Sequence, residues 1–336
     1  MIFVTGGTGF LGAYLLRHLV KQHAGNILAL RRKDSPMQLV ADIQDRIQWV
    51  EGDVLDVPLL DEIMQNVQRV YHCAAIVSFD RRLRKKMHRI NVEGTANVVN
   101  LALYHDIEKL LHVSSIAAIG KPQKGGKLNE RSKWIRSNYN SDYAISKYLS
   151  EQEVWRGMAE GLKVAVVNPS VIIGSGYWHR GTCELFNRVW KGQKLYPTGT
   201  TGFVDVRDVA RMMIQLMEGP WENERFLANG ENLSYLSFFT EVAKAIQREA
   251  PTIKATPFLT GIAWRAETLR TRIFGGQPIV TQSMAHTTAR QYFYDNQKSI
   301  NELDFSYTPI ESTIRETGQQ FLEAKKRGAK FSILPV

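Results

Sequence analysis

The chain has 336 residues, of which 44% are hydrophobic and 23% are charged, a composition typical of a folded globular protein rather than a disordered one. No apolar run is long enough to span a bilayer, and a strand is predicted where a signal peptide would lie. We therefore expect a cytoplasmic protein with no membrane partner. Cys73 and Cys183 match no metal-binding spacing, so no metal site is predicted. The net charge of +10 favours anionic ligands.

The first twelve residues combine an apolar strand, a glycine-rich turn and the start of an amphipathic helix. Glycines at positions 6, 9 and 12 would let the chain turn tightly, let a pyrophosphate approach the backbone and let the helix pack closely on the strand. The free N–H groups at the helix start attract phosphate. This context predicts a dinucleotide-binding unit rather than an ordinary tight turn. The candidate cofactor contacts are Gly6, Thr8, Gly9, Phe10, Leu11 and Gly12.

A second parallel strand is predicted at residues 26–30, followed directly by Arg31, Arg32 and Lys33. In a dinucleotide fold this strand end meets the adenosine ribose, where an acidic residue suits the 2′-hydroxyl of NAD and an arginine suits the 2′-phosphate of NADP. We therefore expect Arg31 and Arg32 to bind the cofactor, with NADP favoured and NAD as the alternative. Asp34 would take the ribose role if the strand ran further, and the cations would otherwise form a solvated loop.

Two further strand ends carry residues suited to a cofactor. After the third predicted strand, residues 47–51, Asp53 could face the adenine ring or could instead cap the following turn. The fourth predicted strand ends in Ala74 and Ala75, whose small side chains would let the cofactor lie against the backbone. Close packing of the strand is the alternative reading of the two alanines.

The stretch from Arg81 to Arg89 holds seven cationic or titratable residues in nine positions. Such runs usually form a solvated face, and a gate for an anionic substrate or a cofactor phosphate is the alternative. The run lacks the aromatic residues that nucleic-acid binding requires, so no nucleic-acid partner is predicted. Residues 92–103 follow with apolar positions at helical spacing, which predicts a packed helix.

A fifth strand is predicted at residues 109–113 and ends at Ser114 and Ser115. Ligands of an open parallel sheet lie beyond the carboxyl ends of its strands, so these hydroxyls point toward chemistry. Tyr143 and Lys147 stand four residues apart on a predicted helix and therefore share one face. We expect the lysine to lower the pKa of the tyrosine from its usual value of about 10, as a general acid–base catalyst requires.

Taken in order, eight motifs resemble those of the extended short-chain dehydrogenases/reductases. This superfamily holds nucleotide-sugar epimerases, dehydratases, and reductases similar to dihydroflavonol reductase and to 3β-hydroxysteroid dehydrogenase. The motifs are residues 5–12, 52–53, 72–75, 91–95, 113–115, 143–147, 168–174 and 203–210. The resemblance implies an α/β fold, a doubly wound parallel-sheet Rossmann domain with a smaller C-terminal substrate lobe. We place the Rossmann domain at residues 1–173, with 203–218 returning to it, and the lobe mainly at 174–336.

The resemblance also implies roles for individual residues. Tyr143 would be the acid–base group, Lys147 would hold the nicotinamide ribose and tune Tyr143, and Ser115 would bind the substrate oxygen. Asn91 would support a proton relay. The residues expected along the cofactor in addition to the glycine turn are Asp53, Val54, Ala74, Ala75, Pro169 and Ile172.

The leading hypothesis is an NAD(P)(H)-dependent oxidoreductase that interconverts a carbonyl and an alcohol of a small-molecule substrate. A nucleotide-sugar epimerase with a retained NAD is the alternative, because Arg180, Arg188 and the run at 81–89 could meet a diphosphate. Dehydration is disfavoured because Ile116 and Ala117 stand where related dehydratases carry an acidic pair.

Two further expectations concern turnover and assembly. A cofactor sensor without turnover is disfavoured because all three expected catalytic side chains are present. The resemblance also implies a homodimer that pairs the helices at 92–103 and 143–154. Aromatic residues at positions 264 and 292–294 would cover the site, which favours an apolar or aromatic substrate, with plain core packing as the other reading.

Overall fold

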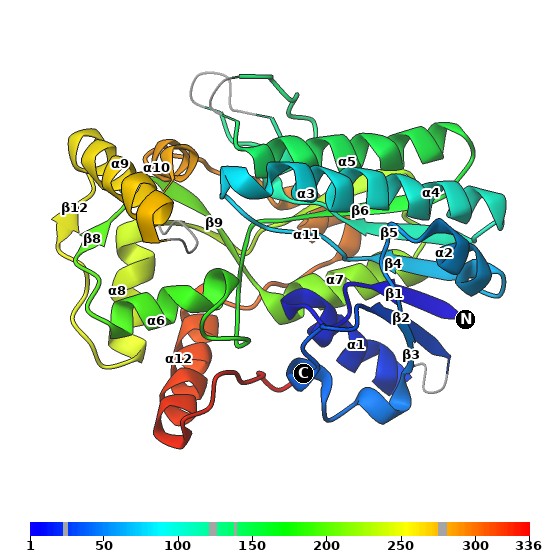
Figure 1. Ribbon diagram of the computed structural model, residues 1–336, viewed down its shortest axis with the longest axis horizontal. Helices are drawn as coiled ribbons and strands as arrows, with labels where there is room; N and C mark the ends of the chain where they lie inside the picture. The colour runs from blue at the N-terminus through cyan, green and yellow to red at the C-terminus, as the bar shows by residue number, and fades with distance from the viewer. Residues whose placement is uncertain (23–25, 121–125, 138–139, 275–280) are drawn as a thin grey trace.

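A computed structural model describes residues 1–22, 26–120, 126–137, 140–274 and 281–336 (Figure 1). At its centre lies a seven-stranded parallel sheet with the strand order β10-β6-β5-β4-β1-β2-β3. Its strands are β1 (Ile2–Thr5), β2 (Ile27–Arg31), β3 (Gln48–Glu51), β4 (Arg69–His72), β5 (Lys109–Val113), β6 (Val164–Pro169) and β10 (Glu224–Ala228). The order reverses between β1 and β4, so the sheet has the doubly wound Rossmann topology that we predicted.

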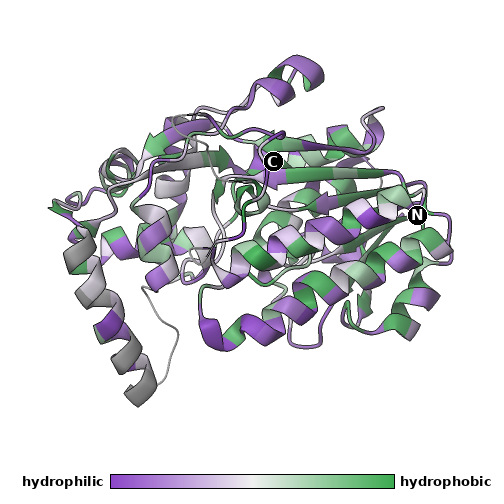
Figure 2. Ribbon diagram, turned by 90° about the horizontal axis from the view of Figure 1, so that it is seen from above, coloured by the Kyte–Doolittle hydropathy of each residue, from purple (hydrophilic) through white to green (hydrophobic). Residues whose placement is uncertain are grey.

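Helices cover both faces of this sheet. Helices α1 (Phe10–Gln22) and α7 (Val206–Glu218) pack on one face, and α2 (Val57–Met64), α4 (Gly94–Tyr104) and α5 (Asp142–Ala159) pack on the other. Strand β1 shows why apolar residues occur at successive positions of a strand: Phe3 and Val4 point to opposite faces, and both are fully buried. Figure 2 shows apolar residues gathered along the strands that these helices enclose.

The smaller lobe has its own aromatic core. Its helices are α6 (Glu184–Trp190), α8 (Tyr235–Ala245), α9 (Pro257–Phe274), α10 (Gln282–Thr288) and α12 (Ile310–Arg327). Helix α11 (Gln297–Leu303) packs instead against β10 of the large sheet. A three-stranded sheet, ordered β11 (Glu231–Ser234), β9 (Thr200–Asp205), β7 (Val171–Ile173), lies beside the helices of the lobe, with a short pair β8 (Leu195–Tyr196) and β12 (Ile253–Lys254). Phe186, Phe203, Phe238 and Phe321 are fully buried where these elements meet.

The chain passes between the two lobes more often than we predicted. Helix α7, in the stretch expected to return to the Rossmann domain, does lie against α1, but the strand that precedes it, β9, belongs to the small sheet. Strand β10, which we assigned to the substrate lobe, is the edge strand of the large sheet and pairs with β6 along its whole length. Without β10 the fully buried strand β6 would have an unpaired edge.

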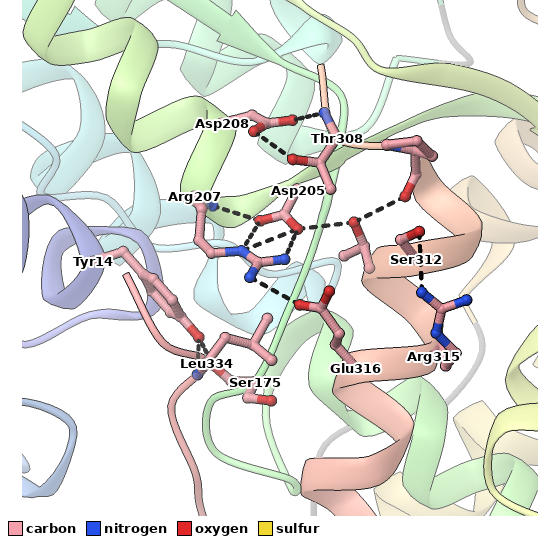
Figure 3. Close-up of polar contacts among 12 residues, drawn as sticks. Tyr14, Ser175, Asp205, Arg207, Asp208, Thr308, Ser312, Arg315, Glu316 and Leu334 are labelled. Atoms are coloured by element: carbon pink, nitrogen blue, oxygen red, sulfur yellow. Dashed lines mark hydrogen bonds and ion pairs between the residues drawn. The ribbon is translucent and has the colours of Figure 1, made fainter. Parts of the chain in front are cut away.

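Buried polar contacts hold the lobes together (Figure 3). Asp205, which caps α7, is fully buried and accepts hydrogen bonds from the Nε and Nη2 of Arg207 at 3.0 and 2.7 Å and from the Thr313 hydroxyl of α12 at 2.8 Å. The same arginine reaches Glu316 of α12 at 2.8 Å. No helix within the described ranges is long and apolar enough to cross a membrane.

Candidate active site

The glycine turn after β1 brings the first helix close to the end of β4. Gly6 has a φ of +71°, and a side-chain carbon there would lie 2.7 Å from the backbone nitrogen of Ala74. A side-chain carbon on Gly12 would lie 2.2 Å from the Gly6 carbonyl oxygen. Gly9 is exposed, and a side-chain carbon there would approach only the Gly6 carbonyl oxygen among the described residues, at 3.1 Å. The helix start is therefore open on the Gly9 side, where the sequence predicts the pyrophosphate.

The cations at the end of β2 lie beside acidic residues. Arg31 is the last residue of the strand, and its guanidinium is 3.4 Å from Glu51 at the end of β3. Arg32 lies 3.7 Å from Asp34. The Asp34 side chain is 85% exposed and lies three residues beyond the strand, so it does not occupy the strand-end position that would face a ribose.

The two pairs expected along the cofactor differ in their surroundings. The Asp53 carboxylate accepts a hydrogen bond from the Leu55 nitrogen at 3.0 Å, so it does stabilise the turn, while Asp56 caps α2. Val54 is buried. Ala74 is half-buried and donates from its backbone nitrogen to the Thr5 hydroxyl at 3.2 Å, and Ala75 is exposed.

The predicted catalytic side chains meet where β5 ends and α5 begins. Ser141 caps α5, its Oγ accepting from the Ala144 nitrogen at 3.1 Å. The Tyr143 phenol hydrogen-bonds the Ser115 hydroxyl. Lys147, only 2% exposed, donates from Nζ to the Val113 carbonyl at 2.7 Å. Ser115 and Tyr143, which are 28 residues apart in sequence, are thus brought together.

Our expectation for the pKa of Tyr143 is wrong in this structure. Burial raises the pKa of the Tyr143 phenol above its usual value, and the hydrogen bond with Ser115 opposes the rise. Burial also lowers the pKa of the Lys147 ammonium to about 8. The spacing of four places the lysine and the phenol on one helix face, but burial is the largest cause of both pKa shifts.

Asn91, which we expect to support a proton relay, is held in place by hydrogen bonds to two segments. It lies in a π-helical turn, Arg89–Glu93, and is 1% exposed. Its Oδ1 accepts from the Ile76 nitrogen at 2.7 Å, and its Nδ2 donates to the Ile76 carbonyl at 2.9 Å and to Ser146 Oγ at 3.0 Å. Both amide hydrogens are therefore used to clamp the segment after β4 to the helix that carries Tyr143.

His72, which we did not single out from the sequence, connects this clamp to the glycine turn. The Thr95 hydroxyl donates to the Asn91 carbonyl at 2.6 Å and must therefore accept from His72 Nε2 at 3.0 Å. The Thr5 hydroxyl accepts from the Ala74 nitrogen and is thus free to donate to His72 Nδ1 at 2.8 Å. The contacts define a neutral imidazole protonated at Nε2, and burial lowers the His72 pKa to about 3.

The expected nicotinamide contacts lie at the end of β6 and in β7. Pro169 is buried as the last residue of β6, and Ile172 in β7 is half-buried against the large core. The ring of Phe10 lies close by, 3.4 Å from where a side-chain carbon on Gly174 would stand. These residues face the same carboxyl edge of the sheets as Ser115.

The basic run lies over the start of α5. Arg84, the first residue of α3 (Arg84–His88), is 3.3 Å from Asp142, which precedes Tyr143. The ring of Phe79, just before the run, lies 5.9 Å from the Tyr143 ring, edge to face. Residues 81–89 therefore lie at the rim of the site.

An apolar cluster lies on the other side of Ser115. Its buried residues are Ile119, Leu128, Leu227 and Tyr294, and Ile116 and Tyr292 pack against them. Ile116 follows Ser115 directly, so the cluster begins beside the serine. Of the aromatic residues that we expected to cover the site, two contribute here, whereas Phe293 is 41% exposed and Trp264 lies on α9.

These features together are those of an enzyme that binds a nicotinamide dinucleotide at the switch point of a Rossmann sheet. Comparison with known proteins agrees. The chain belongs to the NAD dependent epimerase/dehydratase family, whose model matches residues 2–227. It is therefore an NAD(P)-dependent enzyme of the extended short-chain dehydrogenase/reductase type, as its motifs predicted.

Three similar proteins illustrate the range of this family. The chain is 31% identical over 329 residues to a putative dihydroflavonol 4-reductase from Synechocystis sp., covering 95% of this chain and 94% of that one. It is 23% identical over 339 residues to cinnamoyl-CoA reductase 1 from Petunia hybrida, covering 96% and 92%. The structure of a Thermotoga maritima UDP-glucose 4-epimerase matches with a TM-score of 0.77 at 19% identity, covering 96% and 99%, a likeness of fold alone.

Proposed function

We propose that the protein is an NADP(H)-dependent reductase of a small-molecule ketone or aldehyde. The observation that carries the proposal is the meeting of Ser115, Tyr143 and Lys147 at the carboxyl edge of the sheet, beside the glycine turn. The nicotinamide, when bound, supplies the hydride. The protein's own part is to orient the carbonyl, to stabilise its oxygen as charge develops, and to deliver a proton.

Tyr143 and Ser115 divide the work on the oxygen. Their mutual hydrogen bond marks the place where a substrate oxygen would receive a hydrogen bond from each hydroxyl. Because burial raises the pKa of Tyr143, its phenol is protonated near neutral pH and suited to give its proton to an alkoxide. In that protonation state Tyr143 can serve as the acid of the reduction. Lys147, anchored on the Val113 carbonyl, would hold the nicotinamide ribose at the next turn of α5.

The preference for NADP rests on the end of β2. Within the part of the chain that the structure describes, the ion pairs of Arg31 and Arg32 are long, at 3.4 and 3.7 Å, and their partners are at least half exposed or nearly so. Such pairs contribute about 0 to 1 kcal/mol each, so a phosphate carrying up to two charges could replace the carboxylates at little cost. Asp34 lies beyond the strand end, which removes the acidic residue that would favour NAD there.

The apolar cluster beside Ser115 supports an apolar or aromatic substrate. Ile116, which follows Ser115 in the chain, and Tyr292 are only half-buried at the edge of this cluster, and we infer that they would contact an apolar part of the substrate. The names of two similar proteins, a putative dihydroflavonol reductase and a cinnamoyl-CoA reductase, point to aromatic carbonyl compounds as well. We infer that aromatic ketones and aldehydes are the first compounds to screen.

A nucleotide-sugar epimerase with a retained NAD is the second candidate, favoured by the basic rim at residues 81–89. Within the described residues, however, the other two arginines expected near a diphosphate have contacts of their own. Arg188 lies 3.5 Å from Glu184, and Arg180 lies over the Tyr177 ring.

A homodimer that pairs α4 and α5 with their counterparts is a further proposal. It is supported by the packing of these two helices side by side on the outside of the sheet (Figure 1). Sedimentation at micromolar concentration tests it, and a monomer would contradict it.

A cofactor titration tests the proposed preference. NADPH and NADH are titrated into the purified protein while tryptophan fluorescence is followed, and the preparation is checked for cofactor already bound. We expect NADPH to bind more tightly than NADH, and Arg31→Gln or Arg32→Gln to weaken NADPH binding about 10- to 100-fold with little effect on NADH.

The matched control for this titration is Arg69→Gln, which removes a similar arginine that lies 3.6 Å from Glu108. Arg69 is the first residue of β4, so it lies at the amino ends of the strands, away from the predicted cofactor site. This substitution should leave both affinities unchanged. Equal affinity for the two cofactors would contradict the NADP proposal, and NAD that stays bound through purification would favour the epimerase.

A further inference from the structure

We propose that Glu151 is a positioning residue of the active site, holding the Ser115 strand end in place and balancing the charge of Lys147. The proposal rests on the roles given above to Ser115 and Lys147 and adds a third member to their helix face. Glu151 follows Lys147 by four residues on α5, as Lys147 follows Tyr143, so the three side chains leave the helix on one side.

The Glu151 side chain is only 2% exposed, and each of its carboxylate oxygens accepts two hydrogen bonds. One oxygen, Oε2, accepts from Ser114 Oγ at 2.6 Å and from Asn168 Nδ2 at 2.8 Å. The other, Oε1, accepts from Arg225 Nη1 at 2.9 Å and from Trp155 Nε1 at 3.2 Å. A buried carboxylate is costly unless it is paired and hydrogen-bonded, and here four donors from α5, β10 and the ends of β5 and β6 meet that requirement.

These contacts converge on Ser115. Asn168, which donates one amide hydrogen to Glu151, donates the other to the Ser115 carbonyl at 3.1 Å. Ser114, the residue before Ser115, is held directly by the carboxylate. The backbone that aims the Ser115 hydroxyl at Tyr143 is therefore fixed from two sides through one carboxylate.

The Glu151–Arg225 ion pair is also connected to the loop that contains residues 130–133. Arg225 donates to the Glu130 and Ser132 carbonyls as well as to Glu151. The loop packs directly on the segment after Ser115, since a side-chain carbon on Gly120 would lie 1.7 Å from the Lys133 carbonyl oxygen. Arg225 thus couples the placement of this loop to the strand end that carries the serine.

Glu151, one helical turn after Lys147 on α5, is also the carboxylate that favours the Lys147 ammonium and opposes the effect of burial on its pKa. The other titratable groups acting on Lys147 are Cys73 and His72 from the end of β4 and His112 from β5. Burial raises the pKa of the Cys73 thiol to about 12 and lowers the pKa of both histidines, so all three are neutral near pH 7. Among the described residues, the negative charge that favours the Lys147 ammonium is therefore that of Glu151.

The test compares Glu151→Gln with Glu160→Gln, an exposed ion-pair partner of Arg156 at the C-terminal cap of the same helix. For Glu151→Gln we expect kcat/KM for carbonyl reduction to fall about 10- to 100-fold, because the serine is misplaced. The pKa of Lys147 should fall by about 1, so the alkaline limb of the pH profile should move to lower pH. Glu160→Gln should change neither kcat/KM nor the position of the alkaline limb. A purely structural role for Glu151 would lower the free energy of unfolding and leave the limb where it is.

The Lys147 titration can be followed without turnover, by NMR of protein labelled with 13C at the lysine ε-carbons, the signal being assigned through Lys147→Arg. An unmoved Lys147 pKa in Glu151→Gln would overturn the charge-balancing role. Failure of the wild-type protein to reduce any carbonyl would contradict the proposed function instead. If Glu151→Gln does not fold, Ser114→Ala carries the test: kcat should fall about 10-fold with the Lys147 pKa unchanged, and an unaltered kcat would overturn the positioning role.

Discussion

Two buried histidines, His72 and His112, stack with ring centroids 5.4 Å apart but differ in what their nitrogens do. Both nitrogens of His72 are hydrogen-bonded to threonine hydroxyls, whereas neither nitrogen of His112 has a partner within the described chain. The comparison separates the contribution of the hydrogen bonds from that of ring packing. It also shows why His72 could not be found from sequence: Thr5 and Thr95 are 67 and 23 residues away from it.

We expect His72→Phe to reduce the free energy of unfolding by about 1 to 3 kcal/mol more than His112→Phe, because it leaves two buried hydroxyls without their partner. Urea unfolding at pH 7 measures the difference, and equal losses would contradict the network. The pKa of His72 is about 3 in the fold, and histidine in an unfolded chain titrates near 6.5. Below pH 6.5 His72 takes up a proton in the unfolded chain but not in the folded one. The free energy of unfolding therefore decreases as the pH is lowered, and His72→Phe should make this decrease smaller.

At the scale of elements, the best-predicted parts are those whose local pattern agrees with their packing. Strand β5 covers the residues 109–113 that we predicted, since each of its side chains is apolar or buried. The helix with Tyr143 and Lys147 was found from a spacing of four. Strand β10 was assigned to the wrong lobe because its five residues show that it is a strand but not which edge it joins.

Helix α5 depends on its first turn for the placement of Tyr143, two residues after the cap. We expect Ser141→Ala to cost about 1 kcal/mol of stability and also to slow turnover, since the cap bond to the Ala144 nitrogen is lost. Asp56→Ala removes a similar cap from α2, a helix that carries none of the proposed catalytic residues. There the Asp56 carboxylate accepts a hydrogen bond from the Leu59 nitrogen at 3.3 Å. This substitution should cost about as much stability with no loss of turnover. Equal kinetic effects of the two variants would show that the cap has no specific link to catalysis.

At the scale of the whole molecule, the site depends on segments that cross between the lobes. The Glu151–Arg225 pair joins α5 to β10, and the Asp205–Arg207 pair joins α7 to α12 through Thr313 (Figure 3). Local sequence patterns predicted the glycine turn after β1 and placed Tyr143 and Lys147 on one helix, because those patterns depend on short spacings. They missed the buried carboxylate and predicted the wrong direction for the Tyr143 pKa, because burial is a property of the assembled fold.

The account as a whole depends on Tyr143 acting as the proton donor in carbonyl reduction. The most direct test measures NADPH oxidation with a panel of aromatic ketones and aldehydes, comparing the wild type with Tyr143→Phe. The control is Tyr148→Phe on the same helix, whose ring stacks on Trp134. We predict that Tyr143→Phe lowers kcat by at least about 100-fold while NADPH affinity is retained, and that Tyr148→Phe turns over normally. Undiminished turnover by Tyr143→Phe would contradict the role of Tyr143 as proton donor. Tight NADPH binding by a wild type that reduces no carbonyl would contradict the proposed reductase activity.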